Sequence, residues 1–295
     1  MIIIDYKMIC IDMDGTLLNE KRKISECNKD AIMKAYEKGI YIVVSTGRIF
    51  ANAEEFSRLI GVKSPVIASN GAIIRGIDSN HIIHKSYFET KDCISILEIL
   101  KRYKLKPYFN TPEKNYTGDL KYRILLGHAK KRDGVLKKTK LEYVPFYNKW
   151  TKVFEREKDN IVKCEIKCND KEKLSIIRKE LEELNKFDLV SFSTRTIEVT
   201  KKGVSKGKAI ERLAEYYGIK REEIIAIGDS ENDLSMIKYA GIGIAMGNAT
   251  EIVKASANYI TDTNENDGVA KAIYKYLLKD GADNVYRILS ENNFK

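Results

Sequence analysis

The chain has 295 residues, 43% of them hydrophobic, which is enough to bury one large domain or two smaller ones. Its 52 basic and 42 acidic residues give a net charge of +10, which is compatible with anionic partners of several kinds. No apolar stretch approaches the roughly 20 residues of a membrane-spanning helix, so we exclude a protein that spans a membrane.

The first residues contain a short apolar run that Asp5 and Lys7 interrupt. A secretion signal needs a longer unbroken apolar segment, and this run does not resemble one. The five cysteines are scattered and odd in number, so they do not predict a set of disulfide pairs. We therefore expect a protein of the reducing cytoplasm.

A strand, a helix and a second strand are predicted within the first fifty residues. Residues 8–13 and 41–46 are short β-branched apolar runs, and apolar side chains recur at near-helical spacing from Ile24 to Tyr36. Gly39 stands where a C-terminal helix cap is expected. A strand–helix–strand unit normally builds a parallel sheet.

The middle of the chain has a different pattern. Residues 69–84 have the pattern of a hairpin with its turn near Gly76 to Asn80, which would lead the chain out of its first half. Amphipathic helices and short strands follow; helices are predicted over 91–103 and 171–184, and strands over 122–127, 161–168 and 188–193. This pattern predicts a small α+β insert within an α/β domain.

The α/β alternation returns in the last hundred residues. Helix, buried strand, helix, strand and helix are predicted in that order over residues 206–218, 223–229, 232–240, 241–246 and 268–279. Together with the first half, this favours an α/β fold: a doubly wound, Rossmann-like core with a parallel sheet and helices on both faces.

Positive charge is concentrated in the middle of the chain. Residues 101–168 hold 19 Lys and Arg against 8 Asp and Glu, a local charge of +11, while the rest holds 33 basic and 34 acidic residues, or −1. Such a segment could bind small anions or nucleic acid, or it could be a lysine-rich surface that contacts only water. Composition leaves these alternatives open.

Carboxylates stand at the ends of two predicted strands. Asp12 and Asp14 follow the first strand, where Gly15 lets the chain turn, and Asp229 ends the strand over 223–229. Ligands of open parallel sheets collect at the carboxyl ends of the strands, so these groups are expected in one crevice. Carboxylates at short range repel each other unless a cation neutralises them. A hard cation with oxygen ligands, most simply Mg²⁺, suits this set.

Four short stretches resemble, in order, the four motifs of the haloacid dehalogenase-like phosphohydrolases. They are IDMDGT, VSTGR, GVSKGKA and GDSENDLSM, which begin at Ile11, Val44, Gly203 and Gly228. The resemblance is strongest to the Cof-type branch, whose cap is inserted between the second and third motifs. It implies a catalytic core over 1–84 and 195–295 and an α+β cap over 85–194.

The central chemistry is implied by this resemblance. Asp12 would be the nucleophile that attacks phosphorus and forms an aspartyl-phosphate. Asp14 would protonate the leaving oxygen and then activate the water that hydrolyses the intermediate. Mg²⁺ would be held by the Asp12 side chain, the Asp14 backbone carbonyl and Asp229, while Lys206 binds a phosphoryl oxygen.

Further residues are expected around the phosphate. Thr46 and Gly47 follow the second predicted strand, where N–H groups at the start of a helix suit an anion. Asn232 is expected at the phosphate or at the waters of the metal, and Asp233 beyond the direct metal ligands.

Two positions have less specific expectations. Arg48 would contact the substrate or the cap, or else pair with a surface carboxylate. Asn70 and Gly71 form a turn and are expected at the junction of core and cap, with Asn70 near the substrate.

We therefore expect a Mg²⁺-dependent phosphatase that hydrolyses small organic phosphate monoesters, with sugar phosphates as the leading class. Its partner would be a small phosphorylated metabolite, enclosed when the cap closes and steered inward by the basic segment. A phosphotransferase or phosphomutase would keep the same motifs but protect the aspartyl-phosphate from water. A nucleic-acid-binding protein would account for the basic segment but not for Asp12, Lys206 and Asp229.

Overall fold

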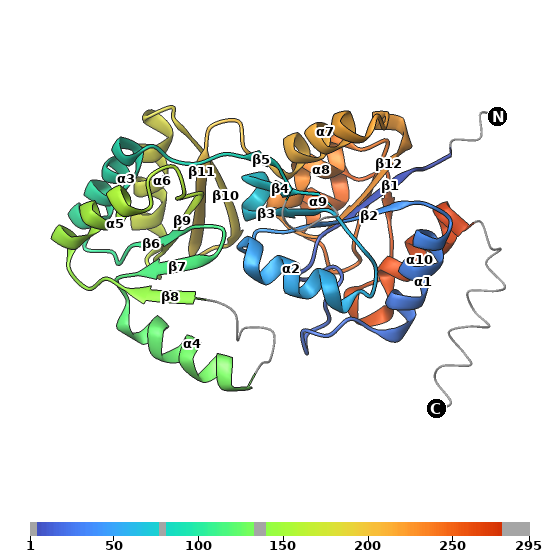
Figure 1. The fold of residues 1–295 in the computed structure, drawn as a ribbon, viewed down its shortest axis with the longest axis horizontal. Helices are drawn as coiled ribbons and strands as arrows, with labels where there is room; N and C mark the ends of the chain where they lie inside the picture. The colour runs from blue at the N-terminus through green and yellow to red at the C-terminus, as the bar shows by residue number, and fades with distance from the viewer. Residues whose placement is uncertain (1–4, 77–80, 133–139, 279–295) are drawn as a thin grey trace.

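The computed structural model describes residues 5–76, 81–132 and 140–278. Figure 1 shows two lobes side by side, each built on its own sheet. The middle of the chain forms the smaller lobe on the left, and the segments before and after it form the larger lobe on the right. The predicted α/β fold with an inserted α+β cap is confirmed. Among the described helices, none combines the length and hydropathy needed to cross a membrane.

The larger sheet has a mostly parallel core. In spatial order its strands are β14 (Tyr259–Ile260), β13 (Ile242–Ala245), β12 (Ile224–Gly228), β1 (Met8–Ile11), β2 (Tyr41–Ser45), β3 (Val66–Ala68), β4 (Ile73–Arg75) and β5 (Ile82–Lys85). Pairing is parallel from β14 to β3, and β4 and β5 add an antiparallel hairpin. Most of the predicted turn of this hairpin, residues 77–80, lies outside the described residues. Because β1 lies between β12 and β2, the ends of these three strands are brought together.

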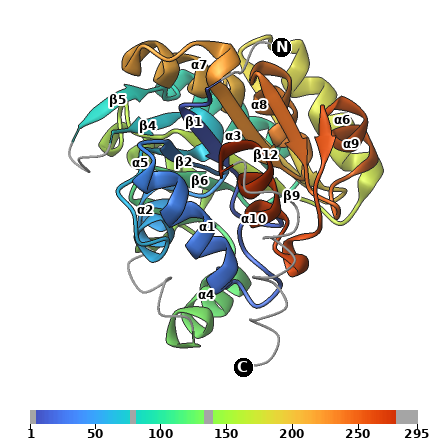
Figure 2. The same cartoon turned by 90° about the vertical axis from the view of Figure 1, so that its right-hand side faces the viewer.

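Helices cover both faces of the larger sheet, as the alternation of buried residues on β1 requires (Figure 2). Ile9 and Ile11 face one cluster of buried residues, and Met8 and Cys10 face another. The first cluster is covered by α1 (Glu26–Glu37), α2 (Phe50–Leu59), α9 (Glu251–Ser256) and α10 (Gly268–Ile273), and the second by α7 (Lys206–Tyr217) and α8 (Leu234–Tyr239). A π-helical turn, Tyr274–Leu278, continues α10.

The smaller sheet is mixed. Its strands are β10 (Phe187–Ser193), β11 (Thr196–Lys201), β9 (Lys163–Lys167), β6 (Tyr108–Asn110), β7 (Lys114–Thr117) and β8 (Lys140–Tyr143). All neighbours are antiparallel except β7 and β8. The outer face is covered by α3 (Thr90–Arg102), α5 (Trp150–Arg156) and α6 (Lys171–Glu183). The other face lies toward the larger lobe (Figure 1), and α4 (Leu120–Arg132) packs on part of it, where Tyr122 contacts Tyr108 of β6.

The division of the chain at 84/85 and 194/195 stays a prediction. Strand β11 pairs with β9 and β10 in the smaller sheet, which favours placing the second boundary after Lys201.

The strand predicted over 122–127 is wrong, because Leu120–Arg132 form the helix α4. The Asp119 carboxylate accepts hydrogen bonds from the backbone N–H groups of Lys121 and Tyr122, at 2.8 and 3.4 Å, and so caps the start of this helix. A short apolar run fits a strand or a helix equally well, and the cap decides between them. The strands predicted over 161–168 and 188–193 are confirmed as β9 and β10.

Candidate active site

A buried lysine lies between two carboxylates at the carboxyl ends of the central strands. Asp12, directly after β1, is 5% exposed, and Lys206, the first residue of α7, is completely buried. The Lys206 Nζ donates hydrogen bonds of 2.6 Å to Oδ1 of Asp12 and of 2.6 Å to Oδ1 of Asp233. An isolated buried ammonium would be strongly destabilising, so these two partners are what allow Lys206 to be charged there.

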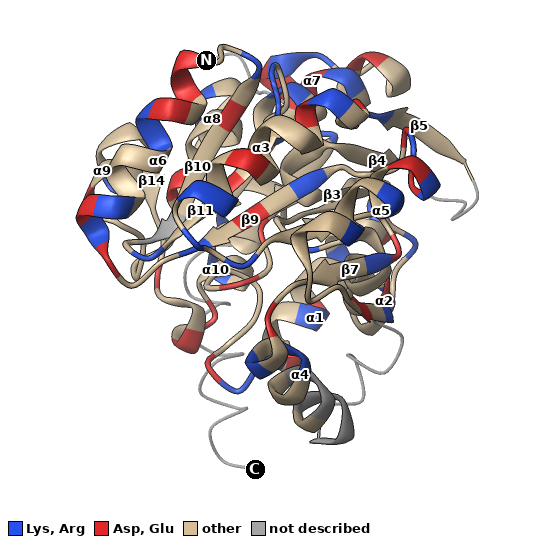
Figure 3. Ribbon diagram, turned by 90° about the vertical axis from the view of Figure 1, so that its left-hand side faces the viewer, with Lys and Arg blue, Asp and Glu red and all other residues tan. Residues whose placement is uncertain are grey.

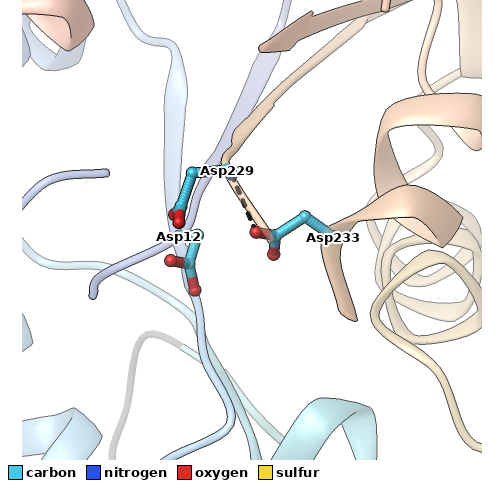
Figure 4. A group of neighbouring side chains, drawn as sticks. All are labelled: Asp12, Asp229 and Asp233. Carbon is cyan, nitrogen blue, oxygen red and sulfur yellow. Dashed lines mark hydrogen bonds between the residues drawn. The ribbon is translucent and has the colours of Figure 1, made fainter. Parts of the chain in front are cut away.

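Asp229 completes a group of three carboxylates that we call the acidic cluster, formed by Asp12, Asp229 and Asp233 (Figure 4). One oxygen from each lies within 4.8 Å of the others. Asp229 follows β12, and its two oxygens accept hydrogen bonds of 2.7 Å from the Thr16 hydroxyl and of 2.7 Å from the Ser230 hydroxyl. These contacts fix the Asp229 carboxylate beside Asp12 while leaving lone pairs on both oxygens.

Asp233 holds the surrounding structure in place with both of its oxygens. Its Oδ1 accepts from Lys206, and its Oδ2 accepts from the N–H groups of Asp229 and Ser230 at 2.9 and 3.0 Å. The bond to Asp229 is the dashed line in Figure 4. Asp233 thus accepts three hydrogen bonds where Asp229 accepts two, and this supports a place for Asp233 beyond the direct metal ligands.

The acidic cluster carries more negative charge than Lys206 can neutralise. Burial, followed by the Asp233 carboxylate, raises the pKa of Asp12, and the same two causes raise the pKa of Asp229. Burial alone would lower the pKa of Lys206, but Asp12 and Asp233 outweigh it and raise this pKa. A divalent cation would supply the missing positive charge and stabilise the ionised carboxylates.

The turn after Asp12 leaves room for Asp229. Gly15 has φ of +83°, a conformation that favours glycine. A Cβ atom at this position would lie 2.6 Å from Oδ2 of Asp229, so any side chain there would displace that carboxylate. The carboxylates of Asp12 and Asp229 offer oxygen ligands only, and this donor set fits the predicted Mg²⁺.

Asp14 is paired with Arg48. The Arg48 Nε and a terminal nitrogen donate to the two carboxylate oxygens of Asp14 at 2.7 and 2.5 Å. Burial would raise the pKa of Asp14, but the Arg48 guanidinium outweighs it and lowers this pKa. Arg48 therefore contacts a carboxylate of the site itself, and in this arrangement Asp14 is ionised.

Asn70 connects the two lobes. Its Nδ2 donates to Oε2 of Glu198 on β11 at 2.6 Å, and its Oδ1 accepts from Nδ2 of Asn232 at 3.2 Å. A carboxylate only accepts, so the bond to Glu198 fixes the orientation of the Asn70 amide and, in turn, that of Asn232. The Asn232 Oδ1 is buried and accepts no hydrogen bond from the described residues. It is thus available to a donor such as a hydroxyl group or a metal-bound water.

These side chains open into a cavity of about 460 Å³ between the lobes. The larger lobe contributes Asp12, Asp14, Thr46, Gly47, Arg48, Ser230 and Asn232, and the smaller lobe contributes Lys163, Glu165 and Glu198. Four predicted site residues contact this lining rather than belong to it: Asn70, Lys206, Asp229 and Asp233.

The three residues from the smaller lobe, which we call the cap wall, were not predicted. Lys163 and Glu165 lie on β9 and Glu198 on β11. Lys163 is 2% exposed; its Nζ forms an ion pair with Glu198 and donates to the backbone oxygen of Gly47 at 2.6 Å. The sequence pattern that could have identified these residues is weak. Charged residues alternate with Cys164 and Ile166 along the strand, and strands with a solvent-exposed face show the same pattern.

Comparison with known proteins agrees with this geometry. The sequence pattern of the family described as haloacid dehalogenase-like hydrolase matches residues 9–273. A 5-amino-6-(5-phospho-D-ribitylamino)uracil phosphatase of Bacillus subtilis is 35% identical over 276 residues, which cover 93% of this chain and 97% of the relative. A phosphoglycolate phosphatase of Methanosarcina acetivorans is 31% identical over 270 residues, covering 91% and 95%. A solved haloacid dehalogenase-like hydrolase of Bacillus subtilis has a TM-score of 0.81 at 32% identity, covering 90% of this chain and 98% of that one.

Proposed function

The chain belongs to the haloacid dehalogenase-like hydrolase family, as a Cof-type phosphatase of small phosphate monoesters, and we propose that it acts on sugar phosphates with the help of Mg²⁺. The observation that carries this proposal is the position of Lys206. Its ammonium binds Asp12 and Asp233 at 2.6 Å each, beside Asp229 and behind a cavity of about 460 Å³. A nucleophile, a cation for phosphoryl oxygens and an oxygen-only donor set thus meet at one place.

Asp12 supplies the nucleophile in the proposed reaction. One of its oxygens attacks phosphorus, the bond from phosphorus to the leaving oxygen breaks, and an aspartyl-phosphate forms on Asp12. Lys206 holds Asp12 in place and offers its charge to a phosphoryl oxygen, while Thr46 and Gly47 face the same cavity. When bound by Asp12, Asp229 and the Asp14 backbone carbonyl, Mg²⁺ would reduce the repulsion between the two anions.

Asp14 handles the protons in both halves of the reaction. It gives a proton to the leaving oxygen, and it then takes a proton from the water that attacks the aspartyl-phosphate and releases phosphate. An ionised carboxylate has no proton to give, so the pair with Arg48 must open and Asp14 must take up a proton from water before it acts as the acid. Arg48 would then be free to contact the substrate.

Phosphate release from a panel of sugar phosphates, nucleotides, cofactor phosphates and a short oligonucleotide tests the proposal, with Mg²⁺ or EDTA present. We expect Mg²⁺-dependent release from small monoesters that is lost in Asp12→Asn. Release without Mg²⁺, or equal activity of Asp12→Asn, would contradict it. An acceptor sugar in the same assay distinguishes hydrolysis from phosphoryl transfer, because a transferase would yield the phosphorylated acceptor.

A further inference from the structure

The cap wall presents its charges on the face of the smaller sheet that lies toward the catalytic residues. Glu165 on β9 is directly opposite Glu198 on β11, and Lys163 shares their face because it lies two residues before Glu165. Like charges directly opposite each other in a sheet are destabilising, and Lys163 offsets this repulsion. Cys164 and Ile166 point the other way, into the helix-covered core of the cap.

The cationic side chains that line the cavity already have partners within the protein. The Lys163 ammonium binds Glu198 and the Gly47 carbonyl and lies 3.3 Å from Glu165. An ammonium has three N–H donors, so these three partners occupy them all. Among the described lining residues Arg48 is the other cation, and both hydrogen bonds of its guanidinium go to Asp14. Lys163 is therefore not free to hold a second anionic group of a substrate, and Arg48, once released from Asp14, lies beside that carboxylate of the larger lobe and not on the cap wall.

Negative charge, by contrast, remains available on the cap wall. The Glu165 side chain is 21% exposed and has only loose pairs with Lys163 and Lys167, at 3.3 and 3.4 Å. Burial opposes ionisation, but Lys163 and Lys167 outweigh it and lower the pKa of Glu165, which is therefore ionised near neutral pH. An ionised carboxylate accepts hydrogen bonds from hydroxyl and amino groups and repels anions.

The basic segment, residues 101–168, adds no further cation to the described lining of the cavity. Of the described residues within 101–168, Lys163 and Glu165 alone line the cavity, one of each sign. Seen from the side of the cap, Lys and Arg are interspersed with Asp and Glu over several elements, and β9 carries both (Figure 3).

We propose that the cap wall recognises an organic group that is rich in hydroxyls and has no negative charge, and that Glu165 selects against substrates with a second anionic group. This inference rests on the proposed function and deepens it. The phosphoryl group binds at Lys206 and the acidic cluster, and the rest of the substrate donates hydrogen bonds to Glu165. A carboxylate or second phosphate in the same place would meet an ionised glutamate and no free cation.

Matched substrate pairs that differ by one carboxylate provide the test. Suitable pairs are glycerol 3-phosphate with 3-phosphoglycerate, erythrose 4-phosphate with 4-phosphoerythronate, and glucose 6-phosphate with 6-phosphogluconate. For each pair that is turned over, kcat/KM is measured for wild type, Glu165→Gln and the control Glu183→Gln. Glu183 is an exposed residue at the end of α6 and does not line the cavity, so its variant changes the charge of the protein equally.

We expect the kcat/KM of the wild type to be roughly tenfold or more higher for the member without the carboxylate. Glu165→Gln should reduce this ratio roughly fivefold. Glu183→Gln should keep the wild-type preference. The ratio of two substrates in one preparation is independent of the fraction of active enzyme, so partial misfolding of Glu165→Gln does not affect it.

Two results would overturn the inference while leaving the proposed function intact. One is equal or faster hydrolysis of the carboxylate-bearing members by wild type, and the other is an unchanged preference in Glu165→Gln. Absence of phosphate release from every compound would instead overturn the proposed function, and this inference with it.

Discussion

The acidic cluster and the cap wall both surround a buried lysine with carboxylates, but they differ in charge. Lys206 has three carboxylates around it, whereas Lys163 has two, one of them partly exposed. The first group is short of positive charge by two, which suits a divalent cation. The second is short of positive charge by one, which leaves the Glu165 carboxylate as an acceptor for the substrate. The comparison teaches that a buried lysine can prepare a site for a metal or can leave one carboxylate that accepts hydrogen bonds and repels anions, depending on how many carboxylates it meets.

The largest expected effect lies in the acidic cluster. Asp12→Asn should reduce kcat roughly 10⁴-fold or more, because an amide cannot form the aspartyl-phosphate. Steady-state phosphate release measures this loss. The control is Asp159→Asn, an exposed residue of the cap at φ 58°, a conformation that asparagine tolerates. A variant of Asp12 with more than a small residual rate would show that the nucleophile is elsewhere.

Replacing each buried lysine should show that Mg²⁺ stabilises the acidic cluster and not the cap wall. Lys206→Met and Lys163→Met should each lower the free energy of unfolding by about 3–5 kcal/mol, because buried carboxylates lose their partner. Mg²⁺ should restore much of the loss in Lys206→Met and none in Lys163→Met. Urea unfolding with Mg²⁺ or EDTA measures both.

Lys91→Met serves as the control for these lysine variants, because its side chain is 70% exposed and its loss should cost less than about 1 kcal/mol. Equal rescue of both buried variants by Mg²⁺ would contradict the distinction between the two regions.

Metal binding should stabilise the wild type by a smaller amount. At a concentration of 100 times its Kd, Mg²⁺ should add about 2.7 kcal/mol to the free energy of unfolding. Asp229→Asn should lose most of this gain, whereas Glu183→Gln, outside the site, should keep it. A gain that survives in Asp229→Asn would place the metal elsewhere.

The two regions should respond to pH with opposite signs. In metal-free protein the folded pKa of Asp12 lies above 3.8, so its contribution destabilises the fold increasingly as pH rises above that value. The folded pKa of Glu165 lies below 4.5, so its contribution is present above pH 4.5 and is lost as pH falls through the folded value. For each group, the free energy of unfolding changes by at most about 1.4 kcal/mol per pH unit.

Urea unfolding in EDTA between about pH 3 and pH 7 checks these signs, because the contribution of Glu165 changes below pH 4.5 and that of Asp12 above pH 3.8. Relative to wild type, Asp12→Asn should gain stability as pH rises and Glu165→Gln should lose it. Parallel curves for wild type and both variants would show that neither group has a shifted pKa.

The smallest effect should be that of salt. In the described part of the basic segment two residues line the cavity, so most of its charge acts on the substrate from a distance and is screened. Raising the salt concentration should lower kcat/KM for highly charged substrates roughly twofold to threefold. A rate that does not change with salt would make this segment a solvated surface without a role in steering.

The two regions also differ in how far the sequence predicts them. Asp12, Thr46 and Asp229 each follow a buried strand, and parallel strands bring such positions together whatever the details of packing. Local sequence is therefore sufficient for the core of the site. Lys206 was found by its motif, since nothing in its spacing distinguishes it from the many other lysines of the chain.

The cap wall could not be predicted because it depends on register. Glu165 and Glu198 are 33 positions apart and meet only because β9 and β11 pair in one particular alignment. The alternation along β9 predicts two faces but not which one is buried against another lobe. The pair of Asp14 with Arg48 likewise arises from a turn geometry that the sequence pattern does not specify.

The position of β1 in the middle of the larger sheet has a consequence for biosynthesis. Its two neighbours are β2 and β12, and Lys206 lies 194 positions after its partner Asp12. While a ribosome adds the residues between β5 and β12, a task on the order of ten seconds, one edge of β1 has no partner. The cap, whose strands are all complete by Lys201, is able to fold before that.

Nascent chains of intermediate length should therefore contain a protease-resistant cap and an exposed, apolar β1 edge that chaperones must shield from aggregation. Limited proteolysis of ribosome-bound chains of increasing length would reveal this order, and early protection of β1 would contradict it. Catalytic competence would then appear abruptly, when the last third of the polypeptide emerges.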